Sequence, residues 1–176
     1  MNYVVMMSTN IMAKANRVYK TKVPVTKNQQ VEAEVVDITY QGMGVIKIDN
    51  FPIFVIDAIP GEVVQVGITK VLKSYAFGRV IKRVKASPNR AENVDKVAIT
   101  TGIAPLANLK YEAQLTFKQR QVEQLFKKVN VSVEVNPTIG MTDPTKYRNK
   151  AQVPVQMVNG QLETGFYRRG SHKLMP

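Results

Sequence analysis

Apolar and polar positions alternate along several short stretches between residues 31 and 84. Val31, Ala33 and Val35 alternate with Glu32 and Glu34, as the residues of a half-buried strand do. Similar stretches follow at 45–48, 52–56, 62–69 and 75–84, separated by turn-forming pairs such as Asp49-Asn50 and Pro60-Gly61. Five short strands at this spacing predict a small closed barrel of the OB type.

The pattern changes after the last of these strands. Pro88 and Asn89 interrupt the alternation, so residues 86–90 are interpreted as a linker or domain boundary. Apolar residues then recur near the helical period between 111 and 129, which predicts a helix with one apolar stripe. The residues of that stripe are Tyr111, Leu115, Val122, Phe126 and Val129. The remaining expected elements are a strand at 131–135 and a hairpin of 151–158 and 162–167, joined by Asn159-Gly160.

These patterns predict a mainly β chain, in which a five-stranded OB-like barrel is followed by an α+β region. Three segments are expected: a partly disordered tail at 1–30, the barrel at 31–86, and the α+β region at 87–176. No internal repeat or low-complexity segment is found.

The charge balance restricts the class of partner. The 176 residues include 25 Lys and Arg against 13 Asp and Glu, for a net charge of +12, which favours nucleic acid or an anionic membrane as partner. A membrane is the weaker alternative, because residues 1–30 lack an amphipathic stripe with aromatic anchors and no apolar run approaches the ~20 residues of a span. No signal peptide is recognised, so a cytoplasmic location is expected.

Catalytic and metal-binding chemistry finds little support in the sequence. The chain has no cysteine and a single histidine, which excludes disulfides, thiolate metal sites and a cysteine nucleophile. Gly42-Met43-Gly44 lacks the further glycine and following helix of a dinucleotide-binding loop, and is interpreted as a tight barrel turn. Ser171 and His172 are adjacent, which is poor geometry for a catalytic pair. No catalytic residue is therefore assigned.

Positive charge is concentrated around the last barrel strand. Between residues 70 and 90 the chain has seven basic residues and no acidic one, namely Lys70, Lys73, Arg79, Lys82, Arg83, Lys85 and Arg90. Strict alternation predicts Tyr75, Phe77 and Arg79 on one face of the strand and Lys82 on the other. Cations interleaved with aromatics on a rigid sheet favour binding to a polyanion such as RNA. The alternative is a solvated edge strand whose lysines prevent aggregation.

Two later strings repeat this mixture of cations and aromatics, at 147–150 and 166–173. Arginine can bind phosphate or stack on a base, asparagine can pair with a base edge, and aromatic rings can stack unpaired bases. The alternatives are an ordinary surface turn for the first string and a core role for Phe166. The full set of candidate RNA-contacting residues is Lys73, Tyr75, Phe77, Arg79, Lys82, Arg148, Asn149, Lys150, Tyr167, Arg168, Arg169 and His172.

Residues 31–85 resemble a TRAM domain, an OB-like RNA-binding barrel attached to RNA-modifying enzymes. The strings that support this resemblance are Glu34-Val35-Val36-Asp37, Gln41-Gly42-Met43-Gly44-Val45, residues 54–62 (FVIDAIPGE) and Gly78-Arg79-Val80. The rest is similar to the start of the central domain of the bacterial 23S rRNA uracil-C5 methyltransferases. Its supporting strings are residues 109–115 (LKYEAQL), Phe117-Lys118, residues 147–155 (YRNKAQVPV) and residues 164–172 (TGFYRRGSH).

The resemblance implies an RNA-binding portion of an enzyme that uses S-adenosylmethionine to form 5-methyluridine in 23S rRNA. The cysteine cluster that holds a [4Fe–4S] centre in this family is absent, since Asp95, Thr101 and Ala104 occupy the corresponding positions. The family's cofactor-binding fold, nucleophilic cysteine and general base would follow Pro176, so the chain alone is expected to be inactive. Self-association through an incomplete central domain is also expected. The alternative function is a stand-alone TRAM-type RNA-binding or ribosome-associated protein.

Overall fold

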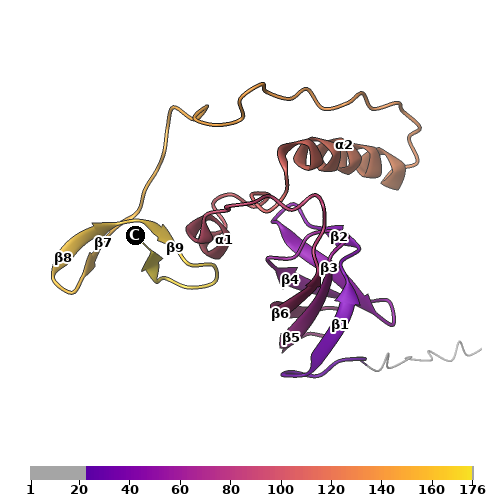
Figure 1. Ribbon diagram of the computed structural model, residues 1–176, viewed down its shortest axis with the longest axis horizontal. Helices are drawn as coiled ribbons and strands as arrows, with labels where there is room; N and C mark the ends of the chain where they lie inside the picture. Colours follow the sequence, from indigo (N-terminus) through magenta and orange to yellow (C-terminus); the bar gives the residue numbers. More distant parts are fainter. Residues whose placement is uncertain (1–22, 176) are drawn as a thin grey trace, which may run out of the picture.

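The structure, a computed structural model, describes residues 23–175, so most of the predicted tail at 1–30 lies outside the described residues (Figure 1). A curled sheet with one long helix beside it forms the larger part, and two small hairpins lie apart from it. The strands of the larger sheet are β1 (Gln30–Glu34), β2 (Asp37–Ile38), β3 (Met43–Ile48), β4 (Phe51–Ile56), β5 (Val63–Val71) and β6 (Ala76–Lys85).

The sheet curls so that its two ends are joined by one stretch of chain. Its strand order is β1-β5-β6-β4-β3-β2, so the consecutive strands β1 and β2 lie at opposite ends. At the bend between them, Val35 N donates to Glu62 O at 2.8 Å and Val36 N donates to Val45 O at 2.9 Å. The first predicted strand therefore contacts both ends of the sheet, and the expected OB-like barrel is confirmed, with that strand divided in two.

The barrel interior contains the alternating apolar residues that the pattern predicts. Ile46, Ile53, Val55, Val64 and Val66 are fully enclosed and pack in one cluster with the other core residues. Val25 is also buried in this cluster, although it lies within the predicted tail. The packing of the barrel therefore begins before residue 31.

One sequence prediction for β6 is wrong. Gln65 lies opposite Lys82 and Val66 lies opposite Val80, so Ile81 has no partner and forms a bulge. Residues directly opposite each other in an antiparallel pair share a face, and the bulge therefore turns Lys82 to the outer face with Phe77 and Arg79. Strict alternation predicts Lys82 on the opposite face, with Val80 and Val84.

The region after the barrel begins with two helices, α1 (Lys96–Thr101) and α2 (Tyr111–Lys128). The second confirms the predicted helix, and Glu112 in its first turn with Lys127 and Lys128 in its last complements the helix dipole. Neither described helix combines the length and apolarity that crossing a bilayer requires.

Helix α2 packs against the barrel through a different face from the predicted stripe. Ala113 and Phe117 contact a small buried cluster of Ile38, Ile59 and Leu109, which joins helix and barrel in a shared core. Along the predicted stripe, by contrast, Val122, Phe126 and Val129 are exposed. The C-terminal half of α2 therefore leaves its apolar side chains in solvent.

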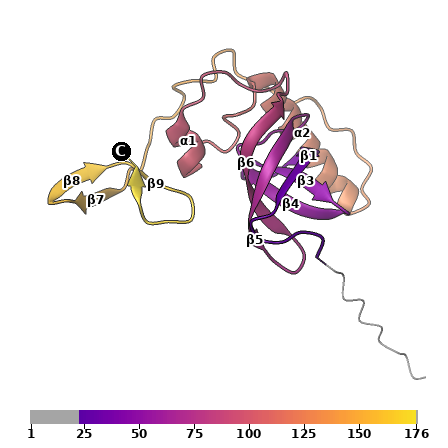
Figure 2. The ribbon, with the colours of Figure 1, turned by 60° about the horizontal axis from the view of Figure 1, so that its bottom comes forward.

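The final region contains two small hairpins that lie apart from the curled sheet, on the side of α1 (Figures 1 and 2). The strand predicted at 131–135 is not formed. The chain after α2 instead runs back along that helix. There Gln119 Nε2 donates to Val135 O and Thr138 Oγ1 donates to Leu115 O, each at 3.1 Å. The predicted hairpin is confirmed in shorter form as β7 (Val155–Val158) and β8 (Gln161–Thr164). A second hairpin pairs β9 (Phe166–Tyr167) with β10 (Leu174–Met175).

Candidate nucleic-acid interface

The outer face of β3, β4 and β6 has a row of apolar and aromatic side chains. Val45 lies opposite Phe54, and Phe54 is the neighbour of Phe77 in the parallel pair of β4 and β6. Tyr75 completes an aromatic trio, whose ring centroids are 5.5 to 5.9 Å apart in edge-to-face and tilted arrangements. Two predicted candidates, Tyr75 and Phe77, are thus brought together, both half-buried.

The predicted cations of the barrel lie on and beside this row. Arg79 is exposed next to Ile56, the bulge brings exposed Lys82 to the same outer face, and Lys73 is exposed in the turn before β6. The acidic residues Glu32 and Glu34 lie on β1, two strands away from β6 in the sheet order. The outer face is therefore cationic on the side of β6 and acidic at β1.

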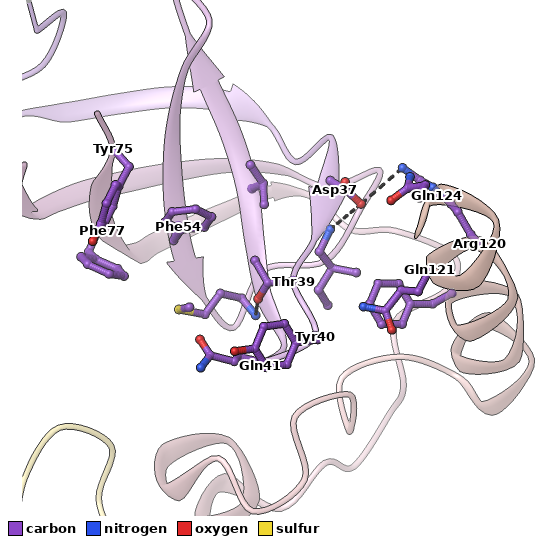
Figure 3. A pocket seen from close by; sticks show the side chains of 14 residues that line it. Asp37, Thr39, Tyr40, Gln41, Phe54, Tyr75, Phe77, Arg120, Gln121 and Gln124 are labelled. Carbon is purple, nitrogen blue, oxygen red and sulfur yellow. Dashed lines mark hydrogen bonds and ion pairs between the residues drawn. The ribbon is translucent and has the colours of Figure 1, made fainter. Parts of the chain in front are cut away.

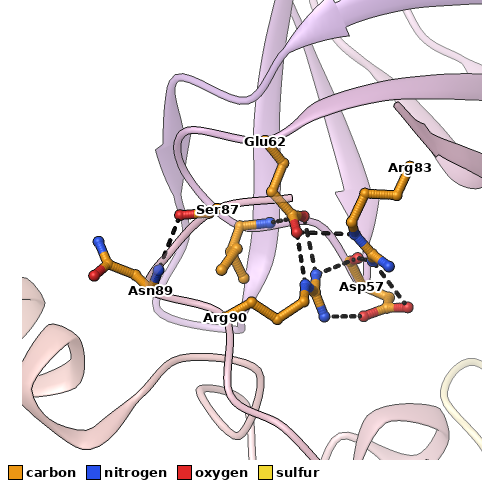
Figure 4. A network of polar contacts seen from close by, with 7 residues as sticks. Asp57, Glu62, Arg83, Ser87, Asn89 and Arg90 are labelled. Carbon is orange, nitrogen blue, oxygen red and sulfur yellow. Dashed lines mark hydrogen bonds and ion pairs between the residues drawn. The ribbon is translucent and has the colours of Figure 1, made fainter. Parts of the chain in front are cut away.

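Two of the seven basic residues in the 70–90 segment have a structural role instead (Figure 4). Arg90 donates from Nε to Glu62 Oε1 at 2.6 Å and from Nη2 to Glu62 Oε2 at 2.9 Å, and from Nη1 to Asp57 Oδ1 at 3.1 Å. Arg83 Nε lies 2.8 Å from Glu62 Oε1 without hydrogen-bond geometry, so that contact is an ion pair. Arg90 follows the barrel, and the network thus fixes the next region to the barrel end.

The charge network also sets the protonation state of its central carboxylate. Glu62 is fully buried, and burial alone would raise its pKa. The hydrogen bonds from Arg90 and the Ile59 amide, together with the positive charges of Arg90 and Arg83, instead hold the pKa of Glu62 below its ordinary value. Burial likewise opposes the charge of Arg90, but Glu62 and Asp57 raise the pKa of Arg90. Glu62 and Arg90 are therefore both charged at neutral pH.

The later candidates do not join the barrel face as a group. Arg148, Asn149 and Lys150 are exposed in a segment without helix or strand. Arg168 lies in the turn of the β9–β10 hairpin, where its backbone N donates to Lys173 O at 2.9 Å. The rings of Tyr167 and His172 meet edge to face with centroids 6.2 Å apart.

Arg169 differs from its neighbours because it connects three parts of the chain. Its backbone N donates to Thr100 O in α1 at 3.0 Å, and its Nη2 donates to Gln41 O in the β2–β3 turn at 2.8 Å. The backbone contact holds the hairpin to α1 and the guanidinium contact holds it to the barrel, a role that the sequence alone did not indicate.

A groove separates α2 from the barrel face (Figure 3). It has a volume of about 460 Å³ and runs from Phe54 on β4, Phe77 on β6 and Tyr75 just before β6 to Gln121 and Gln124 on the helix. Asp37 lies at its edge and pairs with Arg120, with Nη2 and Oδ1 3.3 Å apart.

Tyr40, which sequence analysis missed, also lines this groove. Its side chain is 72% exposed in the turn between β2 and β3. An isolated tyrosine between polar residues gives no periodic signal, although its place beside the Gly-Met-Gly turn could have drawn attention to it.

The described residues contain no group of three or more His, Cys, Asp or Glu side chains that could hold a metal ion. With no cysteine in the whole sequence, a thiolate-bound cluster has no ligands in this chain. The arrangement of charges and rings is suited to binding an anionic, base-bearing ligand.

Residues 24–81 match the family described as the TRAM domain. Over 158 residues the chain is 54% identical to a Lactiplantibacillus plantarum protein named as an uncharacterized RNA methyltransferase, covering 89% of this chain and 35% of that protein. Similarly named proteins of Enterococcus faecalis and Streptococcus agalactiae are 45% and 49% identical over 87% and 85% of this chain, and 34% of each relative. The chain thus spans about a third of the length of these relatives. A solution structure of a conserved Methanococcus maripaludis protein is 32% identical, aligned over 40% of this chain and all of that one with a TM-score of 0.34.

Proposed function

Because residues 24–81 are a TRAM domain and most of the chain is similar to part of proteins named RNA methyltransferases, we propose that this chain is the RNA-binding portion of such an enzyme. The substrate is 23S rRNA, and the reaction of the whole enzyme transfers a methyl group from S-adenosylmethionine to C5 of a uracil. The barrel at 31–86 captures RNA, and the region at 87–176 belongs to the central domain. The location of the enzyme is cytoplasmic.

The observation that supports RNA binding most directly is the outer face of the barrel. Lys73, Arg79 and Lys82 are exposed around Tyr75 and Phe77, and no acidic residue lies on β6. A cationic surface attracts the phosphate backbone regardless of base sequence. Because the strands of the curled sheet pack around a buried core, these charges are held in fixed positions before RNA arrives.

Further RNA contacts are assigned to the exposed cations of the later region. Arg148, Asn149 and Lys150 lie on a segment without helix or strand that can follow an irregular RNA surface. Arg168, Tyr167 and His172 belong to the β9–β10 hairpin, which Arg169 connects to the barrel. These residues extend the positive surface beyond the barrel.

The chemistry of methyl transfer requires groups that this chain does not supply. With no cysteine, it has no thiolate to attack uracil, and we assign it no catalytic residue. S-adenosylmethionine and the nucleophile belong to the remaining part of the intact enzyme. We therefore expect the 176-residue chain to bind RNA without transferring a methyl group.

The test is equilibrium binding of a fluorescent 23S rRNA hairpin by anisotropy between 50 and 300 mM salt. Each phosphate contact contributes about 0.7 to 0.9 to the slope of log K against log salt, so the double variant Arg79→Ala/Lys82→Ala should lose about 1.5 from that slope. The matched control is Lys127→Ala/Lys128→Ala at the exposed end of α2, which should leave the salt slope unchanged. A salt-independent affinity would refute phosphate capture. Equal binding to all RNAs, with no preference for 23S fragments, would favour a general RNA-binding protein.

A further inference from the structure

A continuous groove crosses the outer face of the barrel. The hollow beside α2 adjoins a second hollow of about 540 Å³, and both are lined by Tyr40, Gln41, Met43 and Phe77. The second continues to Arg169 in the β9–β10 hairpin. The barrel forms the floor of this outer groove, α2 flanks one part of it, and the α1 and β9–β10 region flanks the other.

Tyr40 is displayed on a turn that is fixed from several directions. Gly42 N donates to Thr39 O at 2.9 Å, Thr39 N donates to Met43 O at 2.8 Å, and Met43 N donates to Thr39 Oγ1 at 3.1 Å. Arg169 Nη2 donates a hydrogen bond to the carbonyl oxygen of the adjacent residue, Gln41. The Tyr40 ring is 72% exposed, and nothing in the described part of the chain covers it. Its apolar face is therefore accessible to a ligand.

The wall formed by α2 contributes polar groups with both donor and acceptor atoms. Gln121 and Gln124 line the groove opposite the aromatic trio (Figure 3). Neither amide forms a side-chain hydrogen bond to another described residue, whereas Gln119 on a neighbouring face of the same helix is bonded to Glu123 and Val135. Free glutamine amides can pair with the edge of a nucleobase.

The electrostatic surroundings favour an anionic ligand. Asp37 is the one acidic side chain among the residues lining the first hollow, and Arg120 neutralises it. The next row of the barrel face contains Arg79. The acidic residues Glu32 and Glu34 lie at β1, away from the groove. A phosphate backbone can therefore approach this side of the barrel without meeting unpaired negative charge.

We infer that the outer groove binds an unpaired, single-stranded segment of RNA, with bases stacked on Tyr40 and Phe77 and a base edge bonded to Gln121 or Gln124. This inference rests on the proposed function. Duplex RNA is excluded as the occupant, because its bases are stacked on one another and present no free faces to protein rings. The groove thus selects an RNA with an open strand.

The chain contains no tryptophan, so Tyr40→Trp introduces a single reporter of stacking. The probes are a single-stranded RNA decamer, an abasic strand of equal length, and an RNA duplex. Stacking should quench the Tyr40→Trp emission at least twofold with the decamer, and leave it unchanged with the abasic strand and the duplex. The matched control is Leu162→Trp in β8, a position that is also 72% exposed but lies outside the groove, where quenching is not expected.

Anisotropy with the same probes separates the two proposals. If all three probes bind in low salt but Tyr40→Trp is unquenched, or is quenched equally by the abasic strand, the groove inference is wrong and phosphate capture stands. If no probe binds at any salt concentration, both proposals fail.

The double variant Gln121→Ala/Gln124→Ala tests the base contact. It should weaken binding of the decamer about tenfold and leave binding of the abasic strand unchanged. The control variant Gln156→Ala/Gln161→Ala in the β7–β8 hairpin should change the binding of neither probe. Equal weakening for decamer and abasic strand would refute the assigned base contact.

Discussion

Replacement of Glu62 by glutamine tests whether the buried charge network holds the barrel end together. Glu62 is fully enclosed and accepts hydrogen bonds from Ile59 N at 3.1 Å and from two nitrogens of Arg90, with Arg83 in ion-pair contact. Glu62→Gln preserves the shape of the side chain and one acceptor oxygen. It removes the negative charge that both guanidinium groups share and directs an amide NH₂ toward them.

The expected loss of unfolding free energy depends on the solvent contact and the Asp57 contacts that Arg83 and Arg90 keep in the variant. Removing one partner of a buried ion pair costs about 3 to 5 kcal/mol. Arg83 and Arg90 keep 26% and 18% of their side-chain surface in solvent and still contact Asp57, so the lower end applies. We expect Glu62→Gln to reduce the free energy of unfolding by about 3 kcal/mol.

The measurement is urea unfolding followed by circular dichroism at pH 7, with the denaturant slope compared between variants. The matched control is Glu32→Gln on the exposed face of β1, which should change the free energy of unfolding by less than about 0.5 kcal/mol. A loss below about 1 kcal/mol for Glu62→Gln would contradict the argument that buried charges without a partner are costly.

The same pair of proteins tests the direction of the Glu62 pKa shift. The folded state holds the pKa of Glu62 below its ordinary value of 4.5, so the unfolded state takes up its proton first as the pH falls. The stabilisation is therefore fully present above pH 4.5 and is lost as the pH falls below it, through the folded pKa. The stability difference between wild type and Glu62→Gln should shrink in that acid range, and a difference that stays constant or grows there would exclude the assigned shift.

Two further predictions concern packing at a turn and on the second helix. Gly42 has φ of +74°, and a Cβ there would overlap the Pro105 carbonyl, so Gly42→Ala should cost about 1 to 3 kcal/mol for backbone strain and more for the clash. The control is Gly160→Ala, which has φ of +80° and open space around it; equal losses in urea unfolding would show that Pro105 does not contribute. Leu125 is 62% exposed near Val122 and Val129 on α2, so the chain should self-associate and Leu125→Glu should shift it toward monomer in size-exclusion chromatography with light scattering. A wild type that stays monomeric at high concentration would rule out association through this face.

The strands of the barrel could be predicted because alternation reflects one buried face, and Ile46, Val55 and Val66 follow it without exception. The position of Lys82 could not, because a bulge at Ile81 depends on how β5 and β6 pair rather than on either strand alone. Side-chain identity also gives no indication that Arg90 is structural, since its acidic partners Asp57 and Glu62 are distant in sequence.

The apolar stripe of α2 failed as a predictor of packing for a related reason. A helical period identifies which side chains share a face, but not which face meets a neighbour. The barrel contact uses Ala113 and Phe117, while the more apolar C-terminal half of the helix remains exposed. The groove residues Tyr40, Gln121 and Gln124 were missed because they become a site only after this docking.

The candidate RNA surface therefore depends on the region after the barrel as well as on the barrel itself. The barrel supplies the cations and the aromatic row, but Gln121 and Gln124 reach the groove only because Phe117 packs at the barrel end. Arg90, tied to Glu62, fixes the start of the connection that leads to α2. In the proposed function, the exposed cations of β6 and of the later region attract phosphate, whereas the inferred recognition of an open strand also requires helix and barrel in one fixed arrangement.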